Sequence, residues 1–232
     1  MVAILVIVMV AAVLITDLVI RAWRERRGVE IGPRQQVIPL PEWARLPLDK
    51  LRFPAGLFYG RGHTWARVGD DGEVQVGIDD FLNAAVGPVQ QVAFLKEGTK
   101  IARGEPLAQL KQDQITVWVR SPLGGVIRRT NRGVEPSQLQ NDPYGAGWLA
   151  EVHPDNPGSD LHRLRIGHQV KSWIEREALR FGRFLAEPSP RFAMATLQDG
   201  GRPVANRLAA LGPERAQQFA TEFLDDCEEA TQ

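Results

Sequence analysis

The residue types that most often carry chemistry are few and scattered in this chain. Its four histidines show no metal-ligand spacing with cysteines or carboxylates, so no metal site is expected; they are His63, His153, His162 and His168. The adjacent Asp79 and Asp80 could suggest a paired acid and base, but neighbouring side chains point in different directions on a strand or a helix. A helix cap, in which aspartate accepts from free N–H groups, is the better expectation for this pair. No nucleophile, base and orienting group can be named together, so an enzyme is not predicted.

Two further features have simple structural interpretations. A lone histidine on a strand, such as His63 beside Trp65, is more often a hydrogen-bonded structural residue than a ligand. Gly124 and Gly125 lack the following helix and lysine that a phosphate-binding loop needs, so we expect a turn there.

The segment at residues 104–122, GEPLAQLKQDQITVWVRSP, has the pattern of a β-hairpin and resembles the lipoyl-lysine hairpin of the glycine cleavage system H-protein family. Further family-like motifs lie on both sides of it: GHTW at 62–65, VGIDDF at 76–81, EGTKIARGE at 97–105, SPLGGVI at 121–127 and NDPYGAGWL at 141–149. The resemblance implies a barrel-sandwich hybrid domain over residues 58–154.

The hairpin departs from the family at the residue that carries the cofactor. The spacing from Gly104 to Pro122 equals that of the family, which places Gln114 where the modified lysine belongs. Lipoylation joins a carboxyl group to a side-chain amine, whereas the nitrogen of glutamine is already an amide. Lys111 is the nearest amine but lies three residues early, and Cys227, the only cysteine, is far away in the sequence. We therefore expect no cofactor; the alternative is a carrier of lipoate or another acyl group on Lys111.

The second half of the hairpin, residues 115–120, also has the pattern of an interaction surface. Alternation over residues 115–119 places Ile115, Val117 and Val119 inward and turns Trp118 and Arg120 outward beside the hairpin tip. We predict that Trp118, Arg120 and Gln114 contact a partner, because exposed tryptophan is enriched at interface hot spots. The alternative is that Trp118 packs under other parts of the same chain.

Residues 155–232 are predicted to be a mainly helical C-terminal extension. An apolar stripe at helical spacing comprises Val170, Trp173, Ile174, Ala178, Phe181 and Leu185. Lys171, Arg176, Arg180 and Arg183 fall largely on the other faces, a pattern typical of a solvated surface. The alternative is that this basic face contacts anionic lipid or a partner. A strand is expected at residues 192–197, before the turn at 199–201. Pro213 then opens a last amphipathic helix.

The N-terminal region predicts a membrane anchor. Residues 2–20 are almost continuously apolar, enough to cross a hydrocarbon core of roughly 30 Å as one helix. Arginines follow at 21–27 and no charged side chain precedes, so the positive-inside rule predicts a single-pass inner-membrane protein with its bulk in the cytoplasm. A cleaved signal peptide would need a basic region before the apolar run. Residues 1–27 are therefore assigned to the anchor and its basic flank, and the proline-spaced residues 28–57 to a linker.

The whole chain is predicted to be α+β, with a transmembrane helix, an H-protein-like barrel-sandwich domain and a helical extension. A net charge of zero, with no basic stripe, argues against a nucleic-acid partner. The predicted function is a non-catalytic, non-lipoylated scaffold or accessory subunit, bound to other subunits of a membrane-associated complex.

Overall fold

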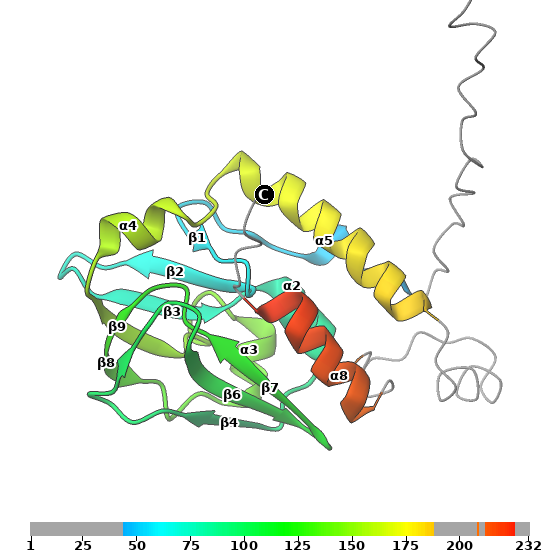
Figure 1. Cartoon of the computed structure of the whole chain (residues 1–232), viewed down its shortest axis with the longest axis horizontal. Coiled ribbons are helices and arrows are strands. Elements are labelled where there is room, and N and C mark those ends of the chain that lie inside the picture. The colour runs from blue at the N-terminus through cyan, green and yellow to red at the C-terminus, as the bar shows by residue number, and fades with distance from the viewer. Residues whose placement is uncertain (1–43, 188–207, 209–211, 226–232) are drawn as a thin grey trace, which may run out of the picture. The chain divides into compact units, whose positions relative to one another are not determined.

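The strands form two antiparallel sheets in the computed structural model, which describes residues 44–187, 208 and 212–225 (Figure 1). The larger sheet has the strand order β1-β2-β3-β9-β8-β5, and the smaller sheet has the order β4-β6-β7. The strands are β1 Phe58–Tyr59, β2 Thr64–Val68, β3 Val74–Ile78, β4 Gln91–Phe94, β5 Lys100–Ile101, β6 Pro106–Gln112, β7 Ile115–Arg120, β8 Gly125–Thr130 and β9 Ala150–Pro154. Every strand of the described residues falls within residues 58–154, where the family resemblance implied a barrel-sandwich hybrid domain.

Helices flank and follow the sheets, and the fold is therefore α+β. The helical elements are η2 Leu48–Lys50, α2 Asp80–Val86, α3 Pro136–Asn141, α4 Pro157–His162, α5 His168–Ala186, α8 Pro213–Phe219 and the π-helical segment η3 Ala220–Leu224. The predicted cap is confirmed for one aspartate of the pair: the Oδ1 of Asp79 accepts from the N–H of Leu82 at 2.9 Å. Asp80 instead lies inside α2 and bonds Arg52.

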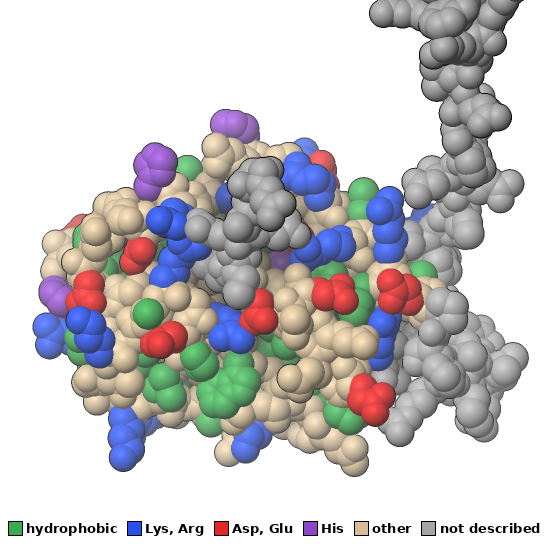
Figure 2. Space-filling model, in the orientation of Figure 1, with side chains coloured by type: hydrophobic (Ala, Val, Ile, Leu, Met, Phe, Trp, Pro, Cys, Tyr) green, Lys and Arg blue, Asp and Glu red, His purple; other side chains and the backbone are tan. Residues whose placement is uncertain are grey.

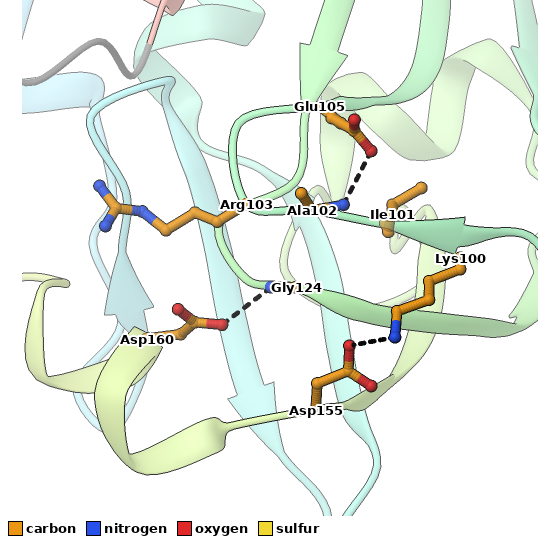
Figure 3. Close-up of a pocket in the computed structure, with 8 residues that line it drawn as sticks. All are labelled: Lys100, Ile101, Ala102, Arg103, Glu105, Gly124, Asp155 and Asp160. Atoms are coloured by element: carbon orange, nitrogen blue, oxygen red, sulfur yellow. Dashed lines mark hydrogen bonds and ion pairs between the residues drawn. The ribbon is translucent and has the colours of Figure 1, made fainter.

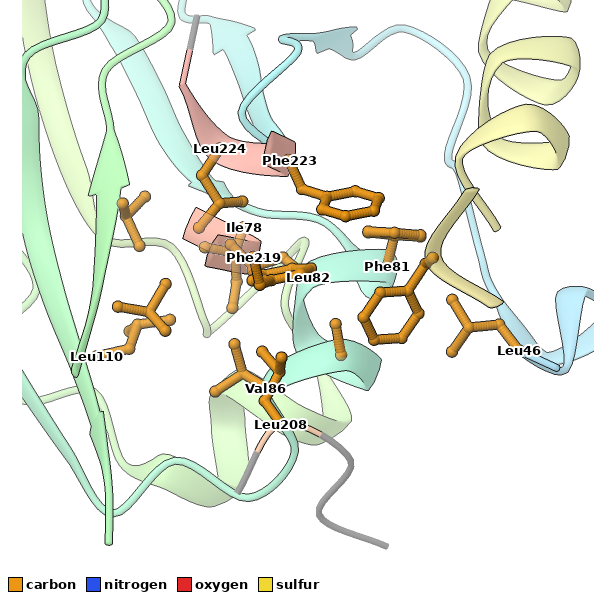
Figure 4. Close-up of a cluster of buried hydrophobic side chains, with 14 of the residues drawn as sticks. Leu46, Ile78, Phe81, Leu82, Val86, Leu110, Leu208, Phe219, Phe223 and Leu224 are labelled. Carbon is orange, nitrogen blue, oxygen red and sulfur yellow. The ribbon is translucent and has the colours of Figure 1, made fainter. Parts of the chain in front are cut away.

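The described part of the C-terminal extension shares the core of the β-rich region. All six residues of the apolar stripe predicted on α5 are buried. They join a cluster that includes α2, the inner face of β6 and β7, and η3 (Figure 4). The ring of Phe181 lies 5.6 Å from Phe81 of α2 and 5.4 Å from Phe219 of α8, measured between centroids. Helices α5 and α8 of the C-terminal extension are therefore part of the same folded body as the sheets, although the sequence predicted them as an extension separate from the barrel-sandwich domain.

The described end of the proline-spaced segment also lies against this body. Leu46 and Leu57 are buried in the same cluster. The backbone N–H and the side chain of Arg52 both donate to the Oδ2 of Asp80, at 2.8 and 3.2 Å. Residues 44–57 therefore wrap around the domain.

The glycine pair is a turn only in part. Gly124 precedes β8, whereas Gly125 is the first residue of that strand and pairs with Pro154 of β9. A Cβ atom at Gly125 would lie 2.1 Å from the carbonyl oxygen of His153. The second glycine is therefore explained by a close approach of two strands, which the sequence pattern does not reveal.

Several predictions fall outside the described residues: the membrane anchor, the strand at 192–197 and the turn at 199–201. Across the part of the chain that is described, no helix is both long and apolar enough to span a bilayer.

Candidate functional site: the β6–β7 hairpin

The hairpin predicted from the sequence is present, and its turn comprises Asp113 and Gln114. The last pair of the ladder joins Gln112 to Ile115, which leaves two residues in the loop. Asp113 has a φ of 50°, a left-handed conformation that aspartate tolerates better than most residues. Gln90 holds this turn from outside: it accepts from the N–H of Asp113 at 3.1 Å and donates to its carboxylate at 2.8 Å. The loop is therefore fixed by a neighbouring segment.

Gln114 is exposed at the turn, and Lys111 is not in the turn at all. Lys111 lies within β6, opposite Thr116 of β7 and Gln91 of β4, and is half-buried. The position that the family resemblance assigns to the modified lysine is thus presented to solvent with an amide side chain. The nearest amine, that of Lys111, belongs to β6, the middle strand of the small sheet.

The alternation predicted along β7 is confirmed. Ile115, Val117 and Val119 are buried, while Trp118 is 42% exposed and lies opposite Gln109. Trp118 therefore lies on the outer face of the small sheet. The alternative, in which other parts of the same chain cover Trp118, would leave it much less exposed than this.

The side chain of Arg120 is held by bonds within its own chain. Its Nη1 donates to the carbonyl of Gly104 at 3.0 Å, and its Nη2 lies 2.6 Å from the Oδ1 of Asp225, just after η3. The sequence could not reveal this ion pair, which joins residues more than a hundred positions apart. Of the three residues predicted to form the interaction surface, Trp118 and Gln114 are exposed and Arg120 is engaged.

Sequence reasoning also missed Gln112, the last residue of β6. Its side chain is 1% exposed, and within the described residues neither its Oε1 nor its Nε2 has a hydrogen-bond partner. Strand alternation places it inward, opposite Ile115. A buried unsatisfied amide destabilises a fold, so this residue is a specific target for mutation.

His63 has the structural surroundings expected of it, although it precedes β2 and has a φ of 57°. Its ring is fully buried and stacks between Phe81 and Trp173, with centroids 3.9 and 4.9 Å away. Its Nδ1 is 2.9 Å from the Oδ2 of Asp79. Among the described residues, no three of the histidine, cysteine or acidic side chains gather as a metal site would require.

The hairpin and its surroundings match a known family. A model of the family "Glycine cleavage H-protein" matches residues 57–177. The "Glycine cleavage system H protein 2" of Aquifex aeolicus is 30% identical over 146 residues, which cover 60% of this chain and 91% of that protein. A "Probable glycine cleavage system H protein" of Pyrococcus abyssi is 32% identical over 132 residues, which cover 56% of this chain and 98% of the relative.

The chain belongs to the glycine cleavage H-protein family.

A crystal structure of a glycine cleavage system H protein from Mycobacterium marinum aligns with 53% of this chain and 98% of its own, at 24% identity and a TM-score of 0.45. The H-protein family match extends beyond Pro154 and takes in α4 and the first part of α5. The resemblance recognised in the sequence covered only residues 58–154. The later part of α5, α8 and η3 lie outside the family match.

A polar depression of about 400 Å³ lies on this H-protein domain between β5, the start of β8 and α4 (Figure 3). The charged groups drawn there are largely paired within the chain. Lys100 lies 3.2 Å from Asp155, and the N–H of Gly124 donates to Asp160 at 2.8 Å. Because a carboxylate already accepts from Gly124, that N–H is not available to a phosphate group.

Proposed function

We propose that this member of the H-protein family is a binding module that carries no lipoyl arm. The observation that supports the proposal is Gln114 at the turn of an otherwise intact hairpin. A carrier must attach its arm through a nucleophilic nitrogen, and a carboxamide has none because its lone pair is delocalised into the carbonyl. No catalytic step is proposed for the chain.

The alternative proposal is a carrier that uses Lys111. Its support is that Lys111 lies three residues from Gln114 and is half-exposed on the outer side of β6. An arm attached there would leave from the middle strand of the small sheet, beside Thr116 and Gln91, and not from the loop. This geometry makes Lys111 the weaker attachment point, and it defines the variant that separates the two proposals, Lys111→Arg.

The partner proposed for the module is another protein subunit, bound through the outer face of the small sheet. Trp118 supports this assignment because it exposes a large ring beside a hairpin whose loop is held in place by Gln90. Rigid aromatic anchors supply much of the energy of protein interfaces. The Oε1 and Nε2 of Gln114 would add hydrogen bonds at the tip.

The cytoplasmic face of the inner membrane is the proposed location of this module. The support is the apolar run at residues 2–20 followed by four arginines at 21–27. Such an anchor would restrict the partner to a membrane-associated assembly. Fractionation and protease accessibility of the full chain in sealed membranes would test the anchor and its orientation separately from the role of the hairpin.

Affinity purification from detergent-solubilised membranes tests the binding role. We expect the wild-type chain to retain a stoichiometric partner and Trp118→Ala to lose most of it. Leu179→Ala, which removes an apolar side chain of α5 that is more exposed than Trp118, should retain the partner. Recovery of the wild-type chain as a lone monomer would contradict the proposal.

A further inference from the structure

The strand β4 forms a free edge of the small sheet. It pairs with β6 on one side, and no described strand pairs with its other side (Figure 1). The opposite edge strand, β7, is in contact with α8 and η3. The edge strands of the large sheet, β1 and β5, have two residues each. Among the described strands, β4 therefore offers the longest edge at which a further strand could be added.

The residues of β4 do little to protect this edge. Edge strands usually carry charged side chains, prolines or bulges, which prevent pairing with another chain. The sequence of β4 is Gln-Val-Ala-Phe, and its three apolar residues are only partly buried. Protective features lie at the two ends: residues 90–91 both stand opposite Lys111, as in a bulge, and the exposed Lys96 follows the strand. Figure 2 shows hydrophobic side chains gathered on the side of the molecule where Figure 1 places the small sheet.

The backbone groups of Val92 and Phe94 face away from β6. The N–H of Leu95 donates to the carbonyl of Leu107 at 3.5 Å, and the register between β4 and β6 has no shift. Along an antiparallel strand, residues that bond to the neighbouring strand alternate with residues that do not. Leu95 and Ala93 therefore bond toward β6. The N–H and C=O groups of Val92 and Phe94 are directed at the free edge.

We propose that a second copy of this chain pairs with β4 in the antiparallel direction, with the two Ala93 residues opposite each other. In this register Val92 of each copy exchanges two hydrogen bonds with Phe94 of the other, so that all the outward backbone groups of these residues are used. The two small sheets then form one sheet of six strands, in the order β7-β6-β4-β4-β6-β7. The arrangement is self-complementary about a two-fold axis, as in most homodimers.

Charges at the ends of β4 favour a second copy over an unrelated strand. The proposed register brings Lys96 of one copy next to Gln90 of the other. The side chain of Gln90 donates to the carboxylate of Asp113 at 2.8 Å, so this residue holds a negative charge close by. Because of the two-fold symmetry, a positive side chain meets a negative one at both ends of the strand pair.

This dimer does not depend on the function proposed above. Strands β4 and β7 are opposite edges of the small sheet, and Trp118 lies on β7. In the six-stranded sheet the outer faces of both copies lie on the same side. Two Trp118 surfaces would then be presented together, which would raise the apparent affinity for a partner that has two binding sites.

A cysteine on the two-fold axis tests the register in the full chain, purified in detergent. The native thiol is removed by Cys227→Ser, and Ala93→Cys then places two thiols opposite each other. Cα atoms in such a non-hydrogen-bonded pair are about 4.5 Å apart, within the range of a disulfide. The matched control, Thr116→Cys, is exposed on the same face but lies on β7.

We expect oxidised glutathione to link the Ala93→Cys chains into dimers about tenfold faster than the Thr116→Cys chains, because only the former hold their thiols at disulfide distance. Equal rates for the two variants would overturn the proposal. The control also accounts for any association through other parts of the chain, since such association would not favour position 93.

A charge at position 93 gives a second readout that needs no added cysteine. Ala93→Glu places two carboxylates directly opposite each other, which destabilises a strand pair. We expect sedimentation of the full chain in detergent to show a dimer whose dissociation constant rises several-fold in Ala93→Glu and changes little in the neutral control Ala93→Gln. A wild-type chain that sediments as a monomer, or equal dissociation constants for the two variants, would overturn the proposal, and so would a different protein bound at β4 in place of the second copy.

Discussion

The Nδ1 of His63 lies 2.9 Å from the Oδ2 of Asp79, and both side chains are fully buried. The other oxygen of Asp79 caps α2, so one carboxylate joins the turn before β2 to the start of that helix. One face of the imidazole ring stacks on Trp173 of α5, with ring centroids 4.9 Å apart. This pair therefore connects the H-protein domain to the C-terminal helices.

Replacing Asp79 with Ala should destabilise the fold by about 2–4 kcal/mol, because it removes a helix cap and leaves a buried imidazole without its partner. Urea unfolding followed by circular dichroism measures the loss. Asp70→Ala, at an exposed position in the β2–β3 loop, is the matched control and should cost less than about 0.5 kcal/mol. Equal costs for the two variants would contradict a structural role for the pair.

Phe181→Ala should cost about 3–5 kcal/mol, the usual price of removing a fully buried aromatic side chain. Phe181 contacts rings of α2, α8 and η3, so the loss should appear in a single cooperative transition for the whole folded body. Leu179→Ala, two residues earlier and 55% exposed, should have little effect. Separate transitions for the β-rich region and the C-terminal helices would show that the two do not share a core.

Gln112→Met should raise the free energy of unfolding by about 1 kcal/mol, because it replaces an unsatisfied buried amide with an apolar side chain of similar length. Chemical denaturation measures the change. Gln91→Met, at an exposed position on the neighbouring strand β4, controls for a general effect of methionine. A marked loss of stability in Gln112→Met would mean that the amide has a hydrogen-bond partner in the folded chain.

The stability of the chain should fall in acid partly through Glu97. The N–H and the hydroxyl of Thr130 donate to its carboxylate, both at 3.1 Å, and lower its pKa below the ordinary value of 4.5. Because the pKa is depressed in the folded state, the stabilisation is present above about pH 4.5 and is lost as the pH falls through the folded-state pKa.

Glu97→Gln removes the titrating group from this position. Unfolding midpoints measured between pH 7 and pH 3 should therefore depend less on pH in the variant than in the wild-type chain. Parallel pH profiles for the two proteins would contradict this assignment.

The sequence predicted the local features of the fold best. Alternation along Ile115, Val117 and Val119 identified the inner face of β7, and helical spacing identified the buried stripe of α5. Both patterns depend on neighbours within one element. The contacts of Arg120 with Asp225, and of His63 with Trp173, join distant elements, and no local pattern encodes them. Gly125 and Gln112 were missed for the same reason, since only the packed strands show what lies next to them.

The intact mass of the chain made in a lipoate-competent host is the most direct test of whether the chain, with Gln114 at its hairpin turn, carries a lipoyl arm. The wild-type chain should have the mass of its unmodified sequence, whereas Gln114→Lys, which restores an amine to the exposed turn, should gain a lipoyl group. A lipoyl adduct on the wild-type chain that disappears in Lys111→Arg would contradict the account and establish the carrier.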